Sequence, residues 1–432
     1  MTLVSSWGRL DKQEHDVCYL SSSDQAVPEI TSAVSGIAYG MGRSYGDVCL
    51  NPEGRLWNTS KLNRFLAFDQ HSGLLSCQAG VTLQQIQQLF IPRGWALPVT
   101  PGTQYVTVGG ALANDVHGKN HHVHGSFGDH VTSIKLLRSD ATMIECGQGN
   151  NEQWFNATVG GIGLTGLILE VELQLRPVNS PWINAEIIPF EGLDDFLQLS
   201  RASESDCEYN VSWVDAASSR RPRGIFISGN HAMEGPPWKQ KQGGLTMPFQ
   251  PPLSMVNHLS VKLFNAAYYQ INKYKAGRSK VHYRPFFYPL DNIGHWNRMY
   301  GPNGFYQHQC VIPFRDALPA MESMLARIHQ SGQGSFLSVL KTFGERQSRG
   351  LLGFPRPGIT LAMDFPNKGE RTLSLLAELD NIVVEAGGSI YLAKDARMSK
   401  GVFRKSYPMI EEFMQFRDPG ISSAMSRRLM EV

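Results

Sequence analysis

The sequence predicts an α+β protein with two domains. The chain has 432 residues, which exceeds what one hydrophobic core usually serves. From 34 to 176, short β-rich runs alternate with glycine turns and scattered helices, without a regular strand-helix repeat. After "RPVNSPW" the strands and helices lengthen and the sequence becomes more polar. We therefore place a domain boundary near residue 180.

Local signals predict several elements in chain order. "TLQQIQQLFIPRG" (82–94) is typical of an amphipathic helix that begins at a Thr cap and ends before Pro and Gly. "VTSIKLLRSDATMIEC" (131–146) predicts a hairpin with its turn at Ser139-Asp140. "GGSIYLAKDARMSKGVF" (387–403) predicts a short apolar strand and then a helix beginning near Ser399.

Composition excludes several function classes. The 40 basic and 38 acidic side chains give a net charge of +2, so no global field attracts nucleic acid, and we expect no nucleic-acid partner. The six cysteines are scattered without C-x-x-C spacing, which favours a reducing compartment. The N-terminus lacks a signal-peptide pattern, and no run approaches the roughly 18 apolar residues of a membrane span. We expect a cytoplasmic protein, with peripheral attachment to the inner membrane face left open.

That membrane question rests on residues 217–282, which are rich in Lys, Arg, Pro and Gly. An ordinary loop with one solvated helix explains this composition. The alternative is a basic amphipathic surface that contacts an anionic membrane. Its apolar members have near-helical spacing and its basic members flank them: Leu259, Val261, Phe264, Tyr268 and Ile271, with Lys262, Lys273, Lys275, Arg278 and Lys280. Both interpretations stay open from the sequence alone.

"GIGLTG" (161–166) matches the dinucleotide fingerprint G-x-G-x-x-G, but its context is reversed. The fingerprint needs a strand before the glycines and a helix after them, so that the helix N-terminus faces the pyrophosphate. Here "NEQWFNATVGG" predicts a helix before the glycines, and "LILEVELQL" predicts a strand after them. We therefore do not expect nicotinamide binding in this mode.

Two other glycine-rich segments carry a stronger signal, "GMGRSYGD" (40–47) and "PVTPGTQYVTVGGALANDVHG" (98–118). Each combines Gly with Ser, Thr and unencumbered backbone amides. Such segments let the main chain approach a pyrophosphate and form an anion-holding nest. Two of them about 60 residues apart, followed by "ATVGGIGLTG", predict a phosphate-bearing cofactor.

"NDVHGKNHHVHG" (114–125) holds four of the 13 histidines, His117, His121, His122 and His124. Zinc would need three or four nitrogen or sulfur ligands that converge. Gly118 and the preceding Gly109-Gly110 argue against one helix that would align His117 with His121, and no nearby cysteine or acidic pair completes a ligand shell. We expect no metal, and we expect the last three histidines to be hydrogen-bonded loop residues.

Several motifs together resemble the vanillyl-alcohol-oxidase-type (PCMH-type) FAD enzymes, and within them the decaprenylphosphoryl-β-D-ribose 2'-oxidase family. They are "GRSYGD", "PGTQYVTVGGALANDVHGKNHHVHGSFGDHV", "WFNATVGGIGLTG", "WNRMYGPNGFYQHQ", "LKTFG", "DFPNK" and "YLAKDAR". The resemblance extends from about residue 36 to "MSRRL" at 425–429. It implies a two-domain fold with an FAD-binding domain at 1–180, an antiparallel-sheet substrate domain at 181–388, and a C-terminal return to the first domain at 389–432.

By this resemblance, the cofactor would be FAD. The matching cofactor-binding positions are Gly42, Arg43, Ser44, Tyr45, Gly46, Gly102, Thr107, Val108, Gly109, Gly110, Asn114, Asp115, Val116, His117, Ile168 and Tyr391. Many relatives attach the flavin covalently to a histidine in the first glycine loop. "YGMGRSYGDVCLN" contains no histidine, so we expect FAD to be bound non-covalently.

The resemblance also assigns catalytic residues. Lys394 follows the matched Tyr391, and a buried lysine near another cation has a lowered pKa and can accept the hydroxyl proton of an alcohol. An exposed ion pair with Asp395 is the ordinary alternative for Lys394. His117 would lie beside the flavin and complete the catalytic set.

The substrate-binding positions implied by the family are Lys119, Tyr300, Gln307, Gln309 and Lys341. Trp213 and Phe305 would pack against sugar or lipid, or simply against the core. Mycobacterial-type members carry Asn and Cys where this chain has Thr360 and Ala362, which puts its fine substrate preference and lipid length in doubt.

The implied activity is oxidation of the ribose 2'-hydroxyl of a polyprenyl-phosphoryl-β-D-ribose to the 2'-keto sugar. This would be the first half of an epimerisation to the arabinose donor for cell-envelope glycans. The implied partners are the polyprenyl-phosphate sugar and a separate NAD(P)H-dependent keto-reductase. Two alternatives stay open, an FAD-dependent oxidase of a soluble alditol, aldonolactone or other sugar alcohol, and a flavin-free scaffold that keeps only the fold.

Overall fold

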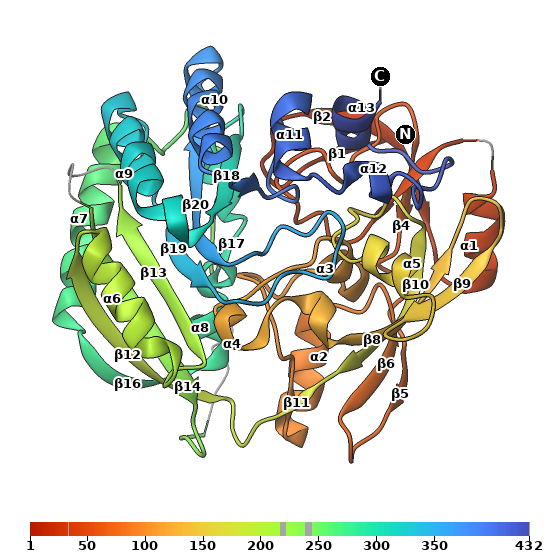
Figure 1. Cartoon of the computed structure of the whole chain (residues 1–432), viewed down its shortest axis with the longest axis horizontal. Helices are drawn as coiled ribbons and strands as arrows, with labels where there is room; N and C mark the ends of the chain where they lie inside the picture. Colours follow the sequence, from red (N-terminus) through yellow and green to blue (C-terminus); the bar gives the residue numbers. More distant parts are fainter. Residues whose placement is uncertain (33, 217–221, 238–243, 432) are drawn as a thin grey trace.

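The computed structural model describes residues 1–32, 34–216, 222–237 and 244–431 and forms two lobes side by side (Figure 1). The first lobe begins with a four-stranded sheet of order β1-β2-β4-β3, in which β2 and β3 both run parallel to β4. Its strands are β1 (Thr2–Ser5), β2 (Lys12–Tyr19), β3 (Gly36–Tyr39) and β4 (Arg55–Asn58). Helix α1 (Ser23–Ile30) connects β2 to β3. The first glycine-rich segment follows β3 directly.

An antiparallel five-stranded sheet of order β5-β6-β10-β8-β9 completes the strand framework of this lobe. Its strands are β5 (Phe65–Phe68), β6 (Leu74–Gln78), β8 (Val131–Leu137), β9 (Met143–Gly147) and β10 (Leu167–Gln174). The short helices around it are α2 (Leu83–Phe90), α3 (Val108–Ala113), α4 (His121–His124) and α5 (Glu152–Thr158). Two-residue strands β7 (Trp95–Ala96) and β11 (Arg176–Pro177) pair where the chain leaves the lobe.

The second lobe is an antiparallel sheet of eight strands among the described residues, of order β16-β12-β14-β13-β19-β20-β18-β21. Their bounds are β12 (Trp182–Glu191), β13 (Tyr209–Asp215), β14 (Arg223–His231), β16 (Gly277–His282), β18 (Phe305–Ile312), β19 (Ser338–Phe343), β20 (Gly358–Pro366) and β21 (Ser389–Ile390). The longer helices of this lobe are α6 (Leu193–Glu204), α7 (His258–Tyr274), α9 (Phe314–Ser331) and α10 (Glu370–Glu385), and α8 (Tyr283–Phe287) is short. A two-residue parallel pair joins β15 (Leu245–Thr246) to β17 (Ile293–Gly294).

After β21 the chain returns to the first lobe through α11 (Lys400–Ser406), α12 (Ile410–Phe413) and α13 (Ala424–Met430), so both termini lie on the same lobe (Figure 1). The Arg428 guanidinium pairs with Asp47 at 2.8 Å and with Asp395 at 3.0 Å. The end of the chain is therefore bonded both to the first glycine loop and to the segment that follows β21. The boundaries near 180 and 389 stay predictions, because one hydrophobic cluster contains side chains of both lobes, such as Leu56 and Phe365.

The predicted local elements are confirmed. Helix α2 has a capping box at Thr82, whose hydroxyl accepts the Gln85 N–H at 3.3 Å, and Gly94 follows in the left-handed conformation. The β8-β9 hairpin turns at 138–142, and Ser399 caps α11. The "GIGLTG" segment lies between helix α5 and strand β10, the reverse of a dinucleotide fingerprint.

His117 and His121 do not share a helix, as expected. Gly109 and Gly110 do not prevent a helix, because both lie inside α3, where Thr107 caps the N-terminus by accepting the Gly110 N–H at 3.1 Å. That helix ends at Ala113, and α4 begins separately at His121, so His117 and His121 still do not share one helix.

The basic amphipathic helix exists, but its faces differ from the expectation. Val261 is buried, and it faces the sheet with Asn265 and Tyr269. Arg278 and Lys280 lie on strand β16 and do not extend the helix. Within 217–282, residues 217–221 and 238–243 lie outside the described part of the chain. None of the described helices has the length and apolarity that crossing a bilayer requires.

Candidate active site

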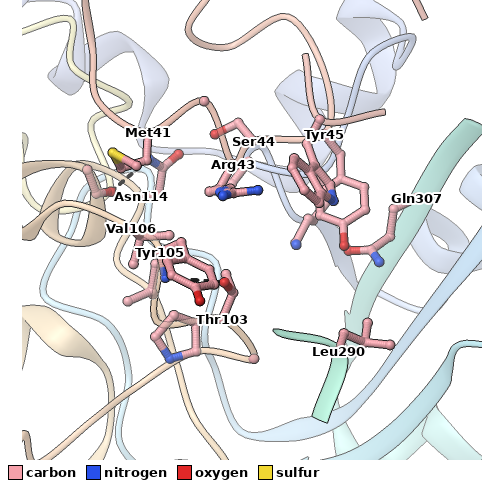
Figure 2. A pocket seen from close by; sticks show the side chains of 18 of the residues that line it. Met41, Arg43, Ser44, Tyr45, Thr103, Tyr105, Val106, Asn114, Leu290 and Gln307 are labelled. Atoms are coloured by element: carbon pink, nitrogen blue, oxygen red, sulfur yellow. Dashed lines mark hydrogen bonds between the residues drawn. The ribbon is translucent and has the colours of Figure 1, made fainter. Parts of the chain in front are cut away.

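A cavity of about 1010 Å³ lies between the two lobes. Its lining comes from both glycine-rich segments, from strands β13, β18, β19 and β20, and from residues 391–394. Figure 2 shows Arg43, Ser44 and Tyr45 of the first segment beside Thr103 and Tyr105 of the second, with Gln307 next to the Tyr45 ring. Ligand cavities usually measure roughly 300–1,000 Å³, so this one has room for a dinucleotide and a sugar together.

Most of the residues predicted from the sequence line this one cavity. They are Gly42, Arg43, Ser44, Tyr45, Gly102, Thr107, Gly109, Gly110, Asn114, Val116, His117, Lys119, Ile168, Gln307, Gln309, Lys341, Tyr391 and Lys394. Their sequence separation is large, so the fold brings distant segments together. The individual roles assigned to them stay predictions.

Four predicted residues support the wall without lining it. Gly46 packs so tightly that an added Cβ would lie 1.7 Å from the carbonyl oxygen of Asp395, and Val108 belongs to a buried apolar cluster. The Asp115 carboxylate accepts the Gly128 N–H at 3.0 Å, and burial raises its pKa to about 6. Tyr300 stacks on Phe305 with ring centroids 4.0 Å apart. Each lies directly behind a lining segment.

The first glycine loop presents backbone donors to the cavity. Gly42 has a φ of 59°, a left-handed conformation that suits glycine. Within the described residues, no hydrogen bond is formed by the backbone N–H groups of Gly42, Arg43 and Ser44, whereas the Tyr45 N–H donates to Ala393. Unpaired amides at a cavity wall are suited to a phosphate. The loop thus provides an anion-binding nest.

The second segment complements this nest. The N-terminus of α3 faces the same cavity through Thr107, Gly109 and Gly110, and nothing would lie within 4 Å of a Cβ added at Gly102. Two buried polar atoms at the wall, Arg43 Nε and Asn114 Oδ1, have no hydrogen-bond partner in the described part of the chain. Buried polar groups are normally satisfied, so these atoms indicate a missing ligand. The chain's own residues therefore fit FAD, whose pyrophosphate the amides would hold.

The cavity contains one cysteine among its lining residues, Cys49. Burial raises the pKa of its thiol to about 12, so it stays protonated and unreactive near neutral pH. With no histidine in the first loop, this agrees with non-covalent attachment of FAD, which stays a prediction.

His117 is packed in an aromatic cage. Its ring lies 5.0 Å from Phe343 and 5.1 Å from Tyr391, centroid to centroid, and its Nε2 lies 2.9 Å from the Gln309 amide nitrogen. Burial and then the neighbouring Lys341 hold the pKa of His117 well below its ordinary value. His117 is therefore a neutral imidazole that accepts the Gln309 N–H, and the pair presents a fixed polar edge to the cavity.

Lys394 lies at the end of the segment after β21. Its Nζ lies 3.7 Å from the centroid of the Tyr45 ring, and it does not form the exposed ion pair with Asp395 that was its alternative. Burial lowers the pKa of Lys394 to about 7, although the nearby Asp364 acts in the opposite direction. Near neutral pH a large fraction of Lys394 is an unprotonated amine. This side chain can accept a proton inside the cavity.

Asp364 on β20 was missed by the sequence analysis. It is fully buried, and its carboxylate accepts the Gln307 amide N–H at 2.5 Å and the Tyr300 hydroxyl at 3.2 Å. Burial raises its pKa to about 7, opposed by these hydrogen bonds and by Lys394. A lone carboxylate inside the apolar run "ITLAMDFP" was the available signal. Asp364 fixes the orientation of Gln307 and provides the nearest negative charge to Lys394.

Two further lysines face the cavity from the side of the second lobe. Lys119 donates to the Phe286 carbonyl, and Lys341 donates to the Gly118 carbonyl at 2.7 Å. Burial lowers the pKa of Lys119 to about 8, and burial together with Lys119 lowers that of Lys341 to about 7. Neither forms an ion pair among the described residues. They are suited to binding hydroxyl groups or an anion.

The remaining histidines of the cluster lie in the short helix α4, so the expectation that they are loop residues was wrong. His121 packs against Phe343 with centroids 4.4 Å apart, His122 Nε2 lies 2.9 Å from the Cys207 carbonyl oxygen, and His124 Nε2 lies 3.4 Å from Glu208. The described residues contain no group of three His, Cys, Asp or Glu placed to hold a metal. Trp213 lines the cavity and donates to Phe336, whereas Phe305 lies in the wall behind Tyr300.

The sequence analysis also missed the outer part of the cavity. Trp7 and Arg9 come from the N-terminal segment, and Asp291, His295 and Arg298 come from the segment before β18. Arg298 lies within the motif "WNRMYGPNGFYQHQ" but was given no role, and the other four residues lie in none of the motifs. All five reach the cavity through contacts between distant segments.

Comparisons with known proteins agree with this geometry. The model of the FAD binding domain family matches residues 32–147. The chain is 36% identical to a decaprenylphosphoryl-beta-D-ribose oxidase from Mycolicibacterium smegmatis over 99% of its own length and 97% of that protein. It is 29% identical to an uncharacterized protein of Streptomyces coelicolor over 81% of its length and all of that relative. An L-gulonolactone oxidase of Mus musculus is 30% identical over only 32% of the chain and 31% of the relative.

The glycine loops at the cavity wall, the family match and the end-to-end similarity agree on one assignment. The chain carries an FAD-binding domain and is an oxidoreductase of the two-domain α+β type. It belongs to the decaprenylphosphoryl-β-D-ribose oxidase family.

Proposed function

We propose that the protein oxidises the ribose 2'-hydroxyl of a polyprenyl-phosphoryl-β-D-ribose to the 2'-keto sugar. The observation that carries this proposal is the meeting of Lys394, the His117-Gln309 pair and both glycine loops at one cavity. The mycobacterial relative, named for decaprenylphosphoryl ribose, aligns with nearly the whole chain and supports this substrate class.

The reaction removes a proton from oxygen and a hydride from carbon. When bound, FAD would supply the acceptor for the hydride. Lys394 accepts the hydroxyl proton, because its amine is already unprotonated in part near neutral pH. The pKa of a general base is best placed near the working pH, and that of Lys394 is about 7.

Other side chains position the sugar. Gln309 is held by His117, and Gln307 is held by Asp364, so both amides face the cavity in fixed orientations. Lys341 lies between the His117 side of the cavity and Lys119, and its ammonium can donate to sugar hydroxyls. Fixed orientation of the carbinol is worth several orders of magnitude in rate.

An anaerobic titration tests the proposal. The purified yellow protein is mixed without oxygen with a short polyprenyl-phosphoryl ribose, and the flavin absorbance is recorded. We expect the flavin colour to bleach at a stoichiometry of one sugar per flavin. An unchanged spectrum with every polyprenyl-phosphoryl ribose tried would exclude this function.

Oxidation of a soluble alditol or aldonolactone is the second candidate. The partial similarity to an L-gulonolactone oxidase favours it, although that similarity covers only a third of the chain. Thr360 and Ala362 line the cavity at the positions where mycobacterial-type members carry Asn and Cys. These two differences are consistent with a different substrate preference. Release of hydrogen peroxide with a free sugar alcohol, without flavin bleaching by the lipid, would support this candidate. A colourless protein unable to take up FAD would instead support a scaffold role.

The proposed product needs a second enzyme, since a 2'-keto sugar must be reduced to give the epimer. We infer that a separate NAD(P)H-dependent keto-reductase consumes it. We also infer that the protein acts in the cytoplasm, at the inner membrane face, because its lipid substrate would reside there.

The outer face of α7 supports this peripheral contact. It carries an exposed apolar stripe at spacings of four, eight and three residues, formed by Leu259, Leu263, Ile271 and Tyr274, which are 53 to 93% exposed. Lys273 and Lys275 lie beside it. A large apolar stripe flanked by lysines is typical of helices that bind the interface of an anionic membrane.

A further inference from the structure

The outer end of the cavity carries two arginines that the chemistry described above does not use. Arg9 precedes β2, and Arg298 lies in the helical turn Trp296–Tyr300; both line the cavity. Within the described residues, neither guanidinium forms an ion pair with a carboxylate, and the Nε of Arg9 is buried without a hydrogen-bond partner. The acidic side chain nearest in the lining, Asp291, accepts the Gln104 N–H at 2.9 Å and lies beside Arg43.

The two arginines lie close enough to repel each other. Burial, and then the charge of Arg298, lower the pKa of Arg9. Their arrangement also needs unfavourable backbone conformations, because Arg9 has a φ of 57° and the neighbouring His295 has a φ of 53°. Left-handed conformations are unfavourable for residues with a side chain and concentrate at functional sites. Like charges held together without an acidic partner form a site for an anion.

The arginines also organise an apolar segment at the cavity mouth. Arg298 donates to the carbonyls of Met247 and Pro248 at 3.0 and 3.2 Å, and Arg9 donates to the Gln250 side chain. Strand β15 pairs with β17, and the Met255 N–H donates to Met299 at 2.9 Å, so residues 245–255 lie along residues 293–301.

Large apolar side chains on this segment face solvent, namely Leu245, Phe249, Leu253 and Met255, all 52 to 79% exposed. They precede α7, whose outer stripe begins at Leu259. An apolar surface therefore extends from the arginines at the cavity mouth towards the proposed membrane-facing helix.

We propose that Arg9 and Arg298 bind the phosphate of the polyprenyl-phosphoryl sugar, with the sugar inside the cavity and the prenyl chain on the apolar surface formed by residues 245–264. This inference rests on the proposed function. A phosphodiester has one negative charge and several acceptor oxygens, and the planar guanidinium donates to such oxygens in pairs. Lys119 and Lys341 donate to backbone carbonyls on the side of His117, and we assign them to the sugar rather than to the phosphate.

The test compares two substrates that differ only in the phosphate, farnesyl-phosphoryl-β-D-ribose and farnesyl β-D-riboside. For Arg298→Gln and Arg9→Gln we expect the KM of the phosphorylated substrate to rise about tenfold or more with kcat little changed, since a charge-assisted bond is lost. The KM of the neutral riboside should not change. Arg298→Lys keeps the charge and should lie between the wild type and the Gln variant.

Arg327→Gln on α9, whose side chain is 57% exposed, is the matched control and should resemble the wild type. Two results would assign the arginines a purely structural role and overturn the inference. One is an equal rise in KM for both substrates, and the other is an equal rise in the KM of the phosphorylated substrate for Arg298→Lys and Arg298→Gln. If the wild type oxidises neither substrate, the proposed function itself fails. If it oxidises both and the Gln variants are unaffected, only the phosphate site fails.

Discussion

Lys394 Nζ lies 3.7 Å from the centroid of the Tyr45 ring, although these residues come from opposite ends of the chain. Tyr45 is held by its backbone, which donates to Ala393 at 3.0 Å, immediately before Lys394. The proposed proton acceptor is thus fixed to the glycine loop that would hold the cofactor. The Tyr45–Ala393 hydrogen bond therefore links the loop proposed to bind the cofactor to the proposed proton acceptor.

Replacing Lys394 by Met should separate these two roles. Methionine keeps a similar volume over the Tyr45 ring but removes the amine. We expect FAD content to stay near that of the wild type, while the rate of flavin reduction by substrate falls about 10²–10⁴-fold, the usual contribution of a general base. Anaerobic stopped-flow absorbance measures this rate. Lys405→Met, at an exposed position of α11, is the control, and undiminished reduction in Lys394→Met would remove Lys394 from the mechanism.

The pH dependence of flavin reduction follows from Lys394 and Asp364. Below pH about 7 the Lys394 amine is protonated and cannot accept a proton, so the rate should rise with pH through about 7. The Asp364 carboxylate raises the pKa of Lys394, so Asp364→Asn should move this rise to lower pH. Single-turnover rates across a pH series measure the shift. A shift towards higher pH would contradict the assigned coupling.

Gly102 offers a direct test of the cofactor site. Gly102 lines the cavity, and a Cβ added at this position meets no protein atom within 4 Å. We expect Gly102→Leu to lower the ratio of flavin to protein absorbance while leaving the thermal unfolding of the flavin-free protein unchanged. Gly401→Ala, at an open position of α11, serves as the control. Full FAD content in Gly102→Leu would place the cofactor elsewhere.

The apolar stripe of α7 predicts binding to membranes. Substituting Leu259 and Leu263 by Gln keeps helix propensity but removes two exposed apolar side chains. Burial of one such side chain in a membrane is worth about 1.5–3 kcal/mol, so partitioning onto anionic vesicles should fall at least about tenfold. Vesicle co-sedimentation measures it. Leu66→Gln removes a leucine that is 45% exposed on β5, and equal loss in this control would mean non-specific adsorption.

A buried ion-pair cluster predicts a stability effect. Asp380 on α10 accepts hydrogen bonds from both Arg397 and His308. Burial tends to raise the pKa of Asp380, but these partners outweigh it and hold the pKa below the ordinary value. Its contribution to stability should therefore be full above the ordinary pKa of an Asp and be lost as pH falls through the lowered folded-state value.

Asp380→Asn would leave Arg397 buried without its counter-charge. We expect the free energy of unfolding, measured by urea titration at neutral pH, to fall by about 3–5 kcal/mol. Asp316→Asn, at a half-exposed position on α9, should change it by less than about 0.5 kcal/mol. A neutral outcome for Asp380→Asn would show that the cluster is not a net source of stability.

The sequence predicted features whose causes are local. The Thr82 cap, the 138–142 turn and the reversed context of "GIGLTG" each depend on neighbouring residues, and the structure confirms them. Motif resemblance additionally selected residues that do meet at one cavity, including Lys394 and Gln309.

The features that the sequence did not reveal concern tertiary contacts. Gly109 and Gly110 disfavour a helix locally, but capping by Thr107 and burial of Val108 and Leu112 outweigh that cost. Asp364 becomes informative only when strand pairing places it opposite Gln307. Arg9 and Arg298 meet only because the N-terminal segment crosses to the second lobe, where the Phe305 N–H donates to the Gly8 carbonyl at 2.8 Å.

The link from Arg428 to Asp47 and Asp395 has a consequence for how the protein is made. Arg428 stands 381 residues after Asp47 in the chain, so this ion pair forms only after the whole intervening chain has been synthesised. A nascent chain can therefore fold the strands of its first lobe but cannot yet join that loop to the lysine segment. The first glycine loop and the segment that follows β21 therefore reach their final arrangement only after synthesis has passed Arg428.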